Sequence, residues 1–279
     1  MRKAWMGLLC GLLVGWSSLA GAEKPKIEVS MQVTGTLSVA ADGTVADYAL
    51  DQRDKLPVEV AQLLDKSLPA FRFEMGARDG TPVQAEMTLQ VVALQLGTGR
   101  VGLALRKARF DETVSQPSDH VVVDTRVPMG YPTQALTAGA AGTVYVAVRI
   151  DRSGHVVEAQ ARQVNLRYLA GEWLMNRMRN VLATKAVAGI RQFTFKVPAT
   201  GPHANDAYFE GVVPVAYLLD GDQPAGYGEW DRYVPGPKQE IAWLDAADAP
   251  KADNVETTPA GEFALAGADL KLLTPLDGG

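Results

Sequence analysis

Residues 28–50 alternate between apolar and polar side chains on either side of an Asp42-Gly43 pair. Alternation of period two is typical of a strand with one buried face, and Asp-Gly favours a tight hairpin turn because it tolerates positive φ. Apolar residues then recur at helical spacing over residues 57–68, after a proline suited to a first helical turn. Similar patterns predict strands at residues 71–75, 83–96 and 100–110. The first part of the chain is therefore predicted to form a sheet with one helix across it.

The same order of elements recurs later in the chain. Alternating runs at residues 143–150 and 155–164 flank a turn that contains Gly154, which predicts a second hairpin. A helix with one buried face is predicted over residues 168–188. Its buried face is expected to hold Leu169, Trp173, Leu174, Met178, Val181, Leu182 and Ala186. Two further strands are predicted at residues 191–197 and 209–219. The repeat of strand, strand, helix, strand, strand predicts a tandem duplication and an α+β fold.

Composition and pattern divide the chain into five parts. They are a signal peptide at residues 1–22, a first unit at 23–110, a linker at 111–126, a second unit at 127–219, and a tail at 220–279 rich in Pro, Gly, Ala and Asp. The aromatic residues of the tail predict that residues 227–243 dock back onto the body, because they would otherwise leave large apolar surfaces in water. Residues 263–273 have the pattern of one further edge strand.

The N-terminus has the features of a secretory signal peptide. Arg2 and Lys3 precede a short apolar run over residues 6–19, and small residues at 20–22 form a cleavage site. We expect export to the periplasm with cleavage before Glu23, and an uncleaved signal anchor is the alternative. The one cysteine, Cys10, lies in this segment, so no disulfide is expected in the mature chain. No second apolar run reaches the roughly 18 residues of a membrane span, so no integral membrane segment is expected after cleavage.

The charge of the chain argues against nucleic acid as a partner. The formal net charge is −5, and residues 220–279 are strongly acidic. Nucleic-acid binding needs a basic surface, which this balance does not provide. Four arginines near the second hairpin raise the possibility of a local basic patch: Arg149, Arg152, Arg162 and Arg167. A solvated sheet face is the preferred interpretation, since alternation places Arg149 on one face.

No motif in the chain carries an obvious reaction. Gly97, Gly99 and Gly102 match a dinucleotide-binding spacing, but the residues that follow alternate as a strand, so we expect a hairpin turn and no cofactor. The three histidines, at positions 120, 155 and 203, lack metal-ligand spacing, and no metal site is expected. The mature chain has no Gly-x-Ser-x-Gly motif. We therefore expect a protein that is not an enzyme, with no catalytic residue and no cofactor.

Three short motifs in the second unit share the spacing of a known family. They are Tyr131-Pro132-x-x-Ala135, Gly142-x-Val144-x-Val146 and Ile150-Asp151-x-x-Gly154-x-Val156. This pattern resembles the start of the TonB C-terminal domain family, and the similarity extends over residues 127–219. Residues 35–92 are similar to a degenerate second copy. The resemblance implies tandem β-β-α-β(β) units, each an antiparallel sheet with one helix packed across it.

The resemblance also implies a function. In that family a partner protein adds a strand to the sheet edge in the periplasm, mainly through main-chain hydrogen bonds. We therefore expect a protein-binding module whose edge strand is residues 209–219 or its neighbour. The expected partner-binding residues are Tyr131, Pro132, Val213, Val215 and Tyr217. The implied partner is a protein of the cell envelope, such as an outer-membrane receptor.

Three other functions remain open at this point. One is a TonB-like component of energy-dependent transport across the outer membrane, which would need a membrane attachment and the Pro-rich spacer that this chain lacks. Another is a hydrolase whose site assembles only in the folded chain. The third is a self-sufficient structural protein whose tail covers its own edge strand.

Overall fold

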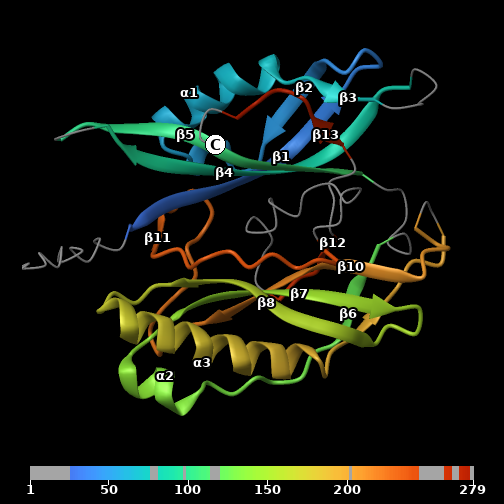
Figure 1. Cartoon of the computed structure of the whole chain (residues 1–279). Helices are drawn as coiled ribbons and strands as arrows, with labels where there is room; N and C mark the ends of the chain where they lie inside the picture. The colour runs from blue at the N-terminus through green and yellow to red at the C-terminus, as the bar shows by residue number, and fades with distance from the viewer. Residues whose placement is uncertain are drawn as a thin grey trace, which may run out of the picture.

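The computed structural model describes residues 26–75, 81–96, 99–113, 120–200, 203–244, 261–265 and 270–276. Within them the chain has an α+β fold, as predicted, with mostly antiparallel sheets and a few helices. Two sheets face each other, each with a helix on its outer face, and the segment around residues 231–239 runs between them (Figure 1). None of the helices in these ranges is long and apolar enough to span a membrane. The predicted signal peptide, residues 1–22, lies outside the described residues.

The first sheet has the strand order β2-β1-β4-β5. These strands are β1 (Glu28–Val39), β2 (Val45–Leu50), β4 (Val83–Gln95) and β5 (Val101–Glu112). A short strand from the C-terminal part, β11 (Asp231–Tyr233), pairs with the start of β1 on the same edge as β2. One face is covered by helix α1 (Val58–Ser67), which lies between the 3-10 turns η1 (Arg53–Lys55) and η2 (Leu68–Ala70).

Alternate side chains of these strands form the first hydrophobic core. Val33 and Leu37 of β1 and Leu89 of β4 are fully buried together with Leu64 of α1. The predicted strand at residues 71–75 is present only as the two-residue β3 (Phe73–Glu74). It pairs with β13 (Lys271–Leu272), and the preceding Arg72 forms an isolated bridge with Thr44 beside β2.

The second sheet has the order β12-β10-β7-β8. Its strands are β7 (Gly142–Asp151), β8 (Val156–Leu166), β10 (Tyr208–Tyr217) and the short β12 (Ala264–Leu265). Helix α3 (Glu172–Ile190) covers its outer face, and α2 (Thr133–Ala138) packs beside α3. A separate pair of short strands, β6 (Val122–Thr125) and β9 (Thr194–Lys196), lies at the end of the sheet. Strand β6 therefore falls in the predicted linker, and β5 extends two residues into it.

The two sheets share local details as well as strand order. The turn glycine of each hairpin, Gly43 or Gly154, has φ of 81°. Its carbonyl accepts a hydrogen bond from the main chain of a phenylalanine after the helix, Phe73 at 2.9 Å or Phe195 at 2.8 Å. A non-glycine residue would be strained at this φ, and a Cβ would collide with the phenylalanine carbonyl. Each glycine therefore lets the hairpin turn dock onto the chain that leaves the helix.

The predicted buried face of the second helix was wrong at two positions. Helix α3 begins at Glu172, so Leu169 lies outside it and is 59% exposed. Trp173 is 72% exposed. At about 100° per residue, Trp173 lies on the opposite side of the helix from the fully buried Leu182. The helical period itself, applied strictly, excludes Trp173 from the core.

Candidate functional site

Strand β10 has a long outer edge that the rest of the chain covers only in part. Its inner edge pairs with β7 from Tyr208 to Tyr217. On the outer edge, β12 pairs at two positions, Gly211 and Val212, and Gly261 donates one further hydrogen bond to the Pro214 carbonyl at 2.7 Å. In the first sheet, the corresponding edge of β4 is paired with β5 along most of its length. The second sheet therefore has a short strand where the first sheet has a long one.

The direction of the main chain decides which groups an added strand would meet on β10. Consecutive residues of an antiparallel strand direct their main-chain groups to opposite sides. The Pro214 carbonyl points outward, so Val213 and Val215 direct theirs toward β7. Proline has no N–H to leave unpaired on the open edge, which is where sheets tolerate it. The outward groups of this strand therefore belong to Pro214, Ala216 and the other even-numbered residues.

The predicted partner-binding residues on β10 have their side chains in the core. Val213, Val215 and Tyr217 are at most 7% exposed and pack against α3 and its surroundings. Burial raises the pKa of Tyr217 to about 12. A partner that adds a strand would contact the main chain of the residues between them.

The other two predicted residues, Tyr131 and Pro132, lie at the start of α2. Tyr131 packs edge-to-face on Tyr217, with ring centroids 5.5 Å apart, and its hydroxyl donates to the Ala140 carbonyl at 2.8 Å. Burial raises the pKa of Tyr131. Tyr131 therefore fixes the entry of the chain into the second sheet, while Pro132 caps α2 and lines a surface groove.

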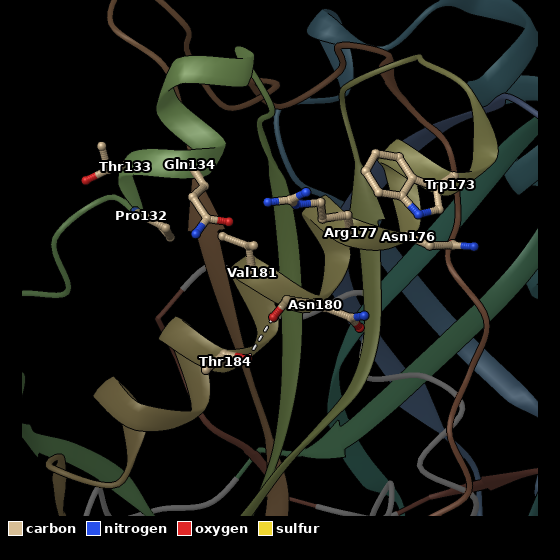
Figure 2. A pocket seen from close by; sticks show the side chains of 9 residues that line it. All are labelled: Pro132, Thr133, Gln134, Trp173, Asn176, Arg177, Asn180, Val181 and Thr184. Atoms are coloured by element: carbon tan, nitrogen blue, oxygen red, sulfur yellow. Dashed lines mark hydrogen bonds between the residues drawn. The ribbon is translucent and has the colours of Figure 1, made fainter.

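That groove, which we call the α3 groove, lies between α2 and α3 and has a volume of about 750 Å³ (Figure 2). Gln134 and Arg177 point into it from opposite sides, above Val181. The Arg177 guanidinium lies over the Trp173 ring, 5.6 Å from its centroid. Within the described part of the chain, no carboxylate is within ion-pair distance of Arg177. The sequence pattern placed Trp173 in the core, so this groove and the exposed ring beside it were missed.

Two smaller hollows adjoin this groove along the same helix. One, of about 450 Å³, lies between α3, β8 and the segment that contains Pro237, and its lining includes Arg162 and Arg179. The other, of about 420 Å³, is lined by residues near the end of α3, including Arg191. Asn176 and Asn180 line both the groove and the first of these hollows, while Thr184 joins the groove to the second.

Three of the four arginines near the second hairpin are bonded by neighbouring groups, and the fourth is buried. Arg149 is paired with Glu158 and Glu210 at 2.6 and 2.7 Å, and its guanidinium lies over the rings of Tyr208 and Trp243. The Arg152 guanidinium donates to main-chain carbonyls, and Arg167 pairs with Asp231 at 2.9 Å. Arg162 is buried at 4% exposure. These four arginines therefore do not form one open basic patch.

A Ser-His-Asp cluster occurs at the turn of the second hairpin. The Ser153 hydroxyl lies 2.6 Å from an Asp151 oxygen and 3.0 Å from His155 Nδ1. In a catalytic triad the carboxylate would bond the histidine ring, whereas here Asp151 accepts from the Ser153 hydroxyl and from two main-chain N–H groups. The hydrogen bond from Ser153 is the main cause that lowers the pKa of Asp151. The arrangement is that of an Asx-type turn, and no group of three potential metal ligands occurs among the described residues.

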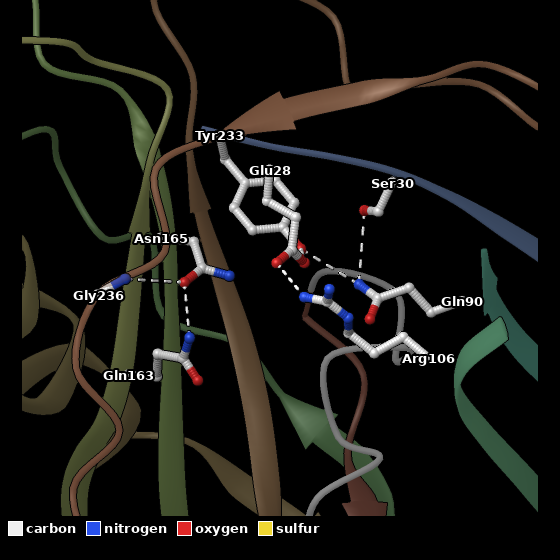
Figure 3. Close-up of polar contacts among 8 residues, drawn as sticks. All are labelled: Glu28, Ser30, Gln90, Arg106, Gln163, Asn165, Tyr233 and Gly236. Carbon is white, nitrogen blue, oxygen red and sulfur yellow. Dashed lines mark hydrogen bonds and ion pairs between the residues drawn. The ribbon is translucent and has the colours of Figure 1, made fainter. Parts of the chain in front are cut away.

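A buried polar network joins the C-terminal segment to the first sheet (Figure 3). The Tyr233 hydroxyl donates to Glu28 at 2.6 Å, and Glu28 also pairs with Arg106. Gln90 donates to Tyr233 at 3.3 Å and to Ser30 at 3.4 Å. None of the described hollows opens onto this network, so we interpret it as structural.

In comparison with known proteins, no protein-family model, no curated protein and no solved structure matches the chain.

Proposed function

We propose that this chain is a periplasmic protein-binding module that takes an extended strand from a partner at the outer edge of β10. The observation that carries the proposal is the ten-residue strand β10, which the described chain pairs on its outer side only around Gly211–Pro214. Extended peptides add to such edges because the main-chain donors and acceptors there are available for a new ladder.

The first sheet provides an internal precedent for this mode of binding. Strand β5 pairs with the edge of β4 from residue 85 to residue 95, on the side that corresponds to the outer edge of β10. A partner strand would occupy the place in the second sheet that β5 occupies in the first.

The segment that contains β12 is a competitor for that place. Each net main-chain hydrogen bond contributes about 0.5–1.5 kcal/mol, so the short pairing of β12 is worth only a few kcal/mol. A partner strand that runs the length of β10 would form more of these bonds and could displace β12. In this proposal the tail covers the edge of β10 through β12 in the free protein, and a partner strand replaces β12 on binding.

The tandem TonB C-terminal-like arrangement and the cell-envelope partner remain part of this proposal. Shared strand order and the matching Gly43–Phe73 and Gly154–Phe195 contacts support a duplicated unit. The alternative role in energy-dependent transport across the outer membrane requires a membrane attachment, and the candidate for it in this sequence, residues 1–22, lies outside the described residues.

A proline on the outer edge of β10 tests the proposal. Ala216 is the suitable position, because its N–H faces outward by alternation from Pro214, whereas proline at Val215 would break the pairing with β7. We expect Ala216→Pro to weaken capture of a partner from cell-envelope extract at least about ten-fold, through the lost hydrogen bond and the steric clash.

Ala216→Val is the matched control, because it changes the side chain and keeps the N–H. It should capture the partner as well as the unchanged protein does, and circular dichroism should show both variants folded. Equal capture by Ala216→Pro and Ala216→Val would contradict strand addition at this edge.

A further inference from the structure

The hollowed side of α3 differs in charge from the chain as a whole. The described lining of the α3 groove and its two adjoining hollows has no aspartate or glutamate, and it includes Arg177, Arg179 and Arg191. The chain has a net charge of −5. A positive concave surface on an acidic protein attracts an anionic partner and concentrates it locally.

Arg179 is a buried cation that forms no ion pair with a carboxylate of the described residues, although the effect of burial on its pKa is partly offset by the nearby charge of Glu172, which raises it. Arg179 is 9% exposed. Its guanidinium donates only to uncharged oxygens, of Val164 and Pro235 at 3.3 Å and of Asn176 at 3.0 Å. Burial lowers the pKa of Arg179, because removing the charged group from water is costly. An anion in the adjoining hollow would stabilise this charge.

The rest of the lining fits a peptide. Side-chain amides such as those of Gln134 and Asn180 both donate and accept, so they can bond the N–H and C=O groups of an extended main chain. Trp173 presents a large exposed ring, the type of residue that anchors protein interfaces.

Two other anionic partners fit less well. A bilayer surface is flat on this scale and would not fill concave hollows of about 750, 450 and 420 Å³. Nucleic acid would be repelled by the net charge of −5. An acidic segment of another protein can enter the hollows and place its carboxylates at separate arginines.

We propose that the α3 groove and its adjoining hollows bind an acidic segment of a partner protein that crosses α3 over Asn176 and Asn180. One carboxylate lies at Arg177 and another at Arg179 on the opposite flank, with an apolar or aromatic side chain against Trp173. None of the lining residues belongs to β10, so this surface is separate from the strand edge of the proposed function. A partner could occupy both surfaces, or two partners could bind one each.

Fluorescence anisotropy with a labelled ten-residue peptide tests this inference. The probe contains alternating Glu and Ser residues with one central Phe, and its neutral analogue has Gln in place of Glu. We expect the acidic probe to bind and the neutral analogue to bind about ten-fold more weakly, with an affinity that falls as salt is raised. Absence of binding by the acidic probe at millimolar protein, or equal binding by the two peptides, would overturn the proposal.

Three variants locate the binding site. Arg177→Gln and Trp173→Ala alter exposed side chains, so the fold should be unaffected, and each should weaken binding of the acidic probe about five- to ten-fold. Lys66→Gln, on α1 of the first sheet, is the matched charge control and should bind like the unchanged protein. Equal affinity in Arg177→Gln and Lys66→Gln would place binding elsewhere.

Vesicles and the strand-edge variant separate this proposal from its alternatives. Vesicles of phosphatidylglycerol and phosphatidylethanolamine should not bind the protein, and vesicle binding that depends on Trp173 would assign the surface to a membrane instead. Ala216→Pro should bind the acidic probe normally, since Ala216 is not part of the lining. A failed strand-capture experiment would therefore contradict only the strand-addition proposal, and a failed peptide-binding experiment would contradict only the proposal for the α3 groove.

Discussion

Leu166 and Val234 exchange both of their main-chain hydrogen bonds, at 3.0 and 2.7 Å. Leu166 ends β8 of the second sheet, while Tyr233, the neighbour of Val234, pairs with Glu28 of the first sheet. The Gln239 N–H then donates to the Arg162 carbonyl at 2.7 Å, further along β8. One short stretch therefore adds to the edges of both sheets and fixes how they lie relative to each other.

Replacing Val234 by proline should loosen this link. The change removes the N–H that donates to the Leu166 carbonyl, and we expect the free energy of unfolding to fall by about 2–4 kcal/mol. Denaturant unfolding measures the loss, and hydrogen exchange should show a less protected amide at Leu166. Val234→Ala keeps the main-chain pair and should leave that amide protected, so equal exchange at Leu166 in the two variants would contradict the role assigned to the pair.

This link also marks the limit of what the sequence could predict. Period-two and helical patterns located the hairpins and the helices α1 and α3, because each of these segments buries one face against its own sheet, while the short α2 was not predicted. The stretch around Val234 is bordered by Pro235 and Pro237 and has no such period. Its partners, Glu28 and Leu166, are distant in sequence, and main-chain pairing leaves little trace in side-chain pattern.

The candidate sites were also predicted only in part from the sequence. The sequence indicated β10 as an edge strand, but the direction of each main-chain group depends on register, which only the contact between Gly261 and Pro214 reveals. The α3 groove was missed because its floor and walls come from two helices. A strict helical wheel would have placed Trp173 outside the core, and that was the available signal.

The role of the hairpin glycine Gly154 can be tested by comparison with Gly139, which ends helix α2 and also has a positive φ. Gly154 has φ of 81°, and a Cβ there would lie 1.9 Å from the Phe195 carbonyl oxygen. Gly139 has φ of 65° with nothing within 4 Å of such a Cβ. We expect Gly139→Ala to cost about 1 kcal/mol through backbone strain alone, and Gly154→Ala to cost about 3 kcal/mol or more through strain and collision. Thermal or denaturant unfolding checks both, and equal losses would show that the docking of the turn on Phe195 matters little.

Tyr217 makes stability sensitive to alkaline pH. Burial raises its pKa to about 12 in the folded chain, against about 10 when unfolded. The unfolded chain therefore loses its proton first, and stability should fall as pH rises from 10 towards 12. The buried hydroxyl has no hydrogen-bond partner among the described residues, so Tyr217→Phe should be neutral or slightly stabilising at pH 7.

Unfolding of Tyr217→Phe across this pH range gives the check. The variant should lose less stability than the unchanged protein between pH 10 and 12, while Tyr227, whose pKa burial also raises to about 12, keeps part of the loss in both. Parallel curves for the two proteins would mean that the hydroxyl of Tyr217 reaches solvent.

Trp173 and Leu182 give opposite expectations although both are large apolar residues of α3. Leu182 is fully buried in the second core, and Leu182→Ala should reduce the free energy of unfolding by about 2–5 kcal/mol through lost burial and the cavity left behind. Trp173 is 72% exposed, and Trp173→Ala should change stability by less than about 1 kcal/mol. Denaturant unfolding of both variants measures the contrast. A loss for Trp173→Ala as large as that for Leu182→Ala would place Trp173 in the core, and the groove would then lack the exposed ring on which its partner is expected to pack.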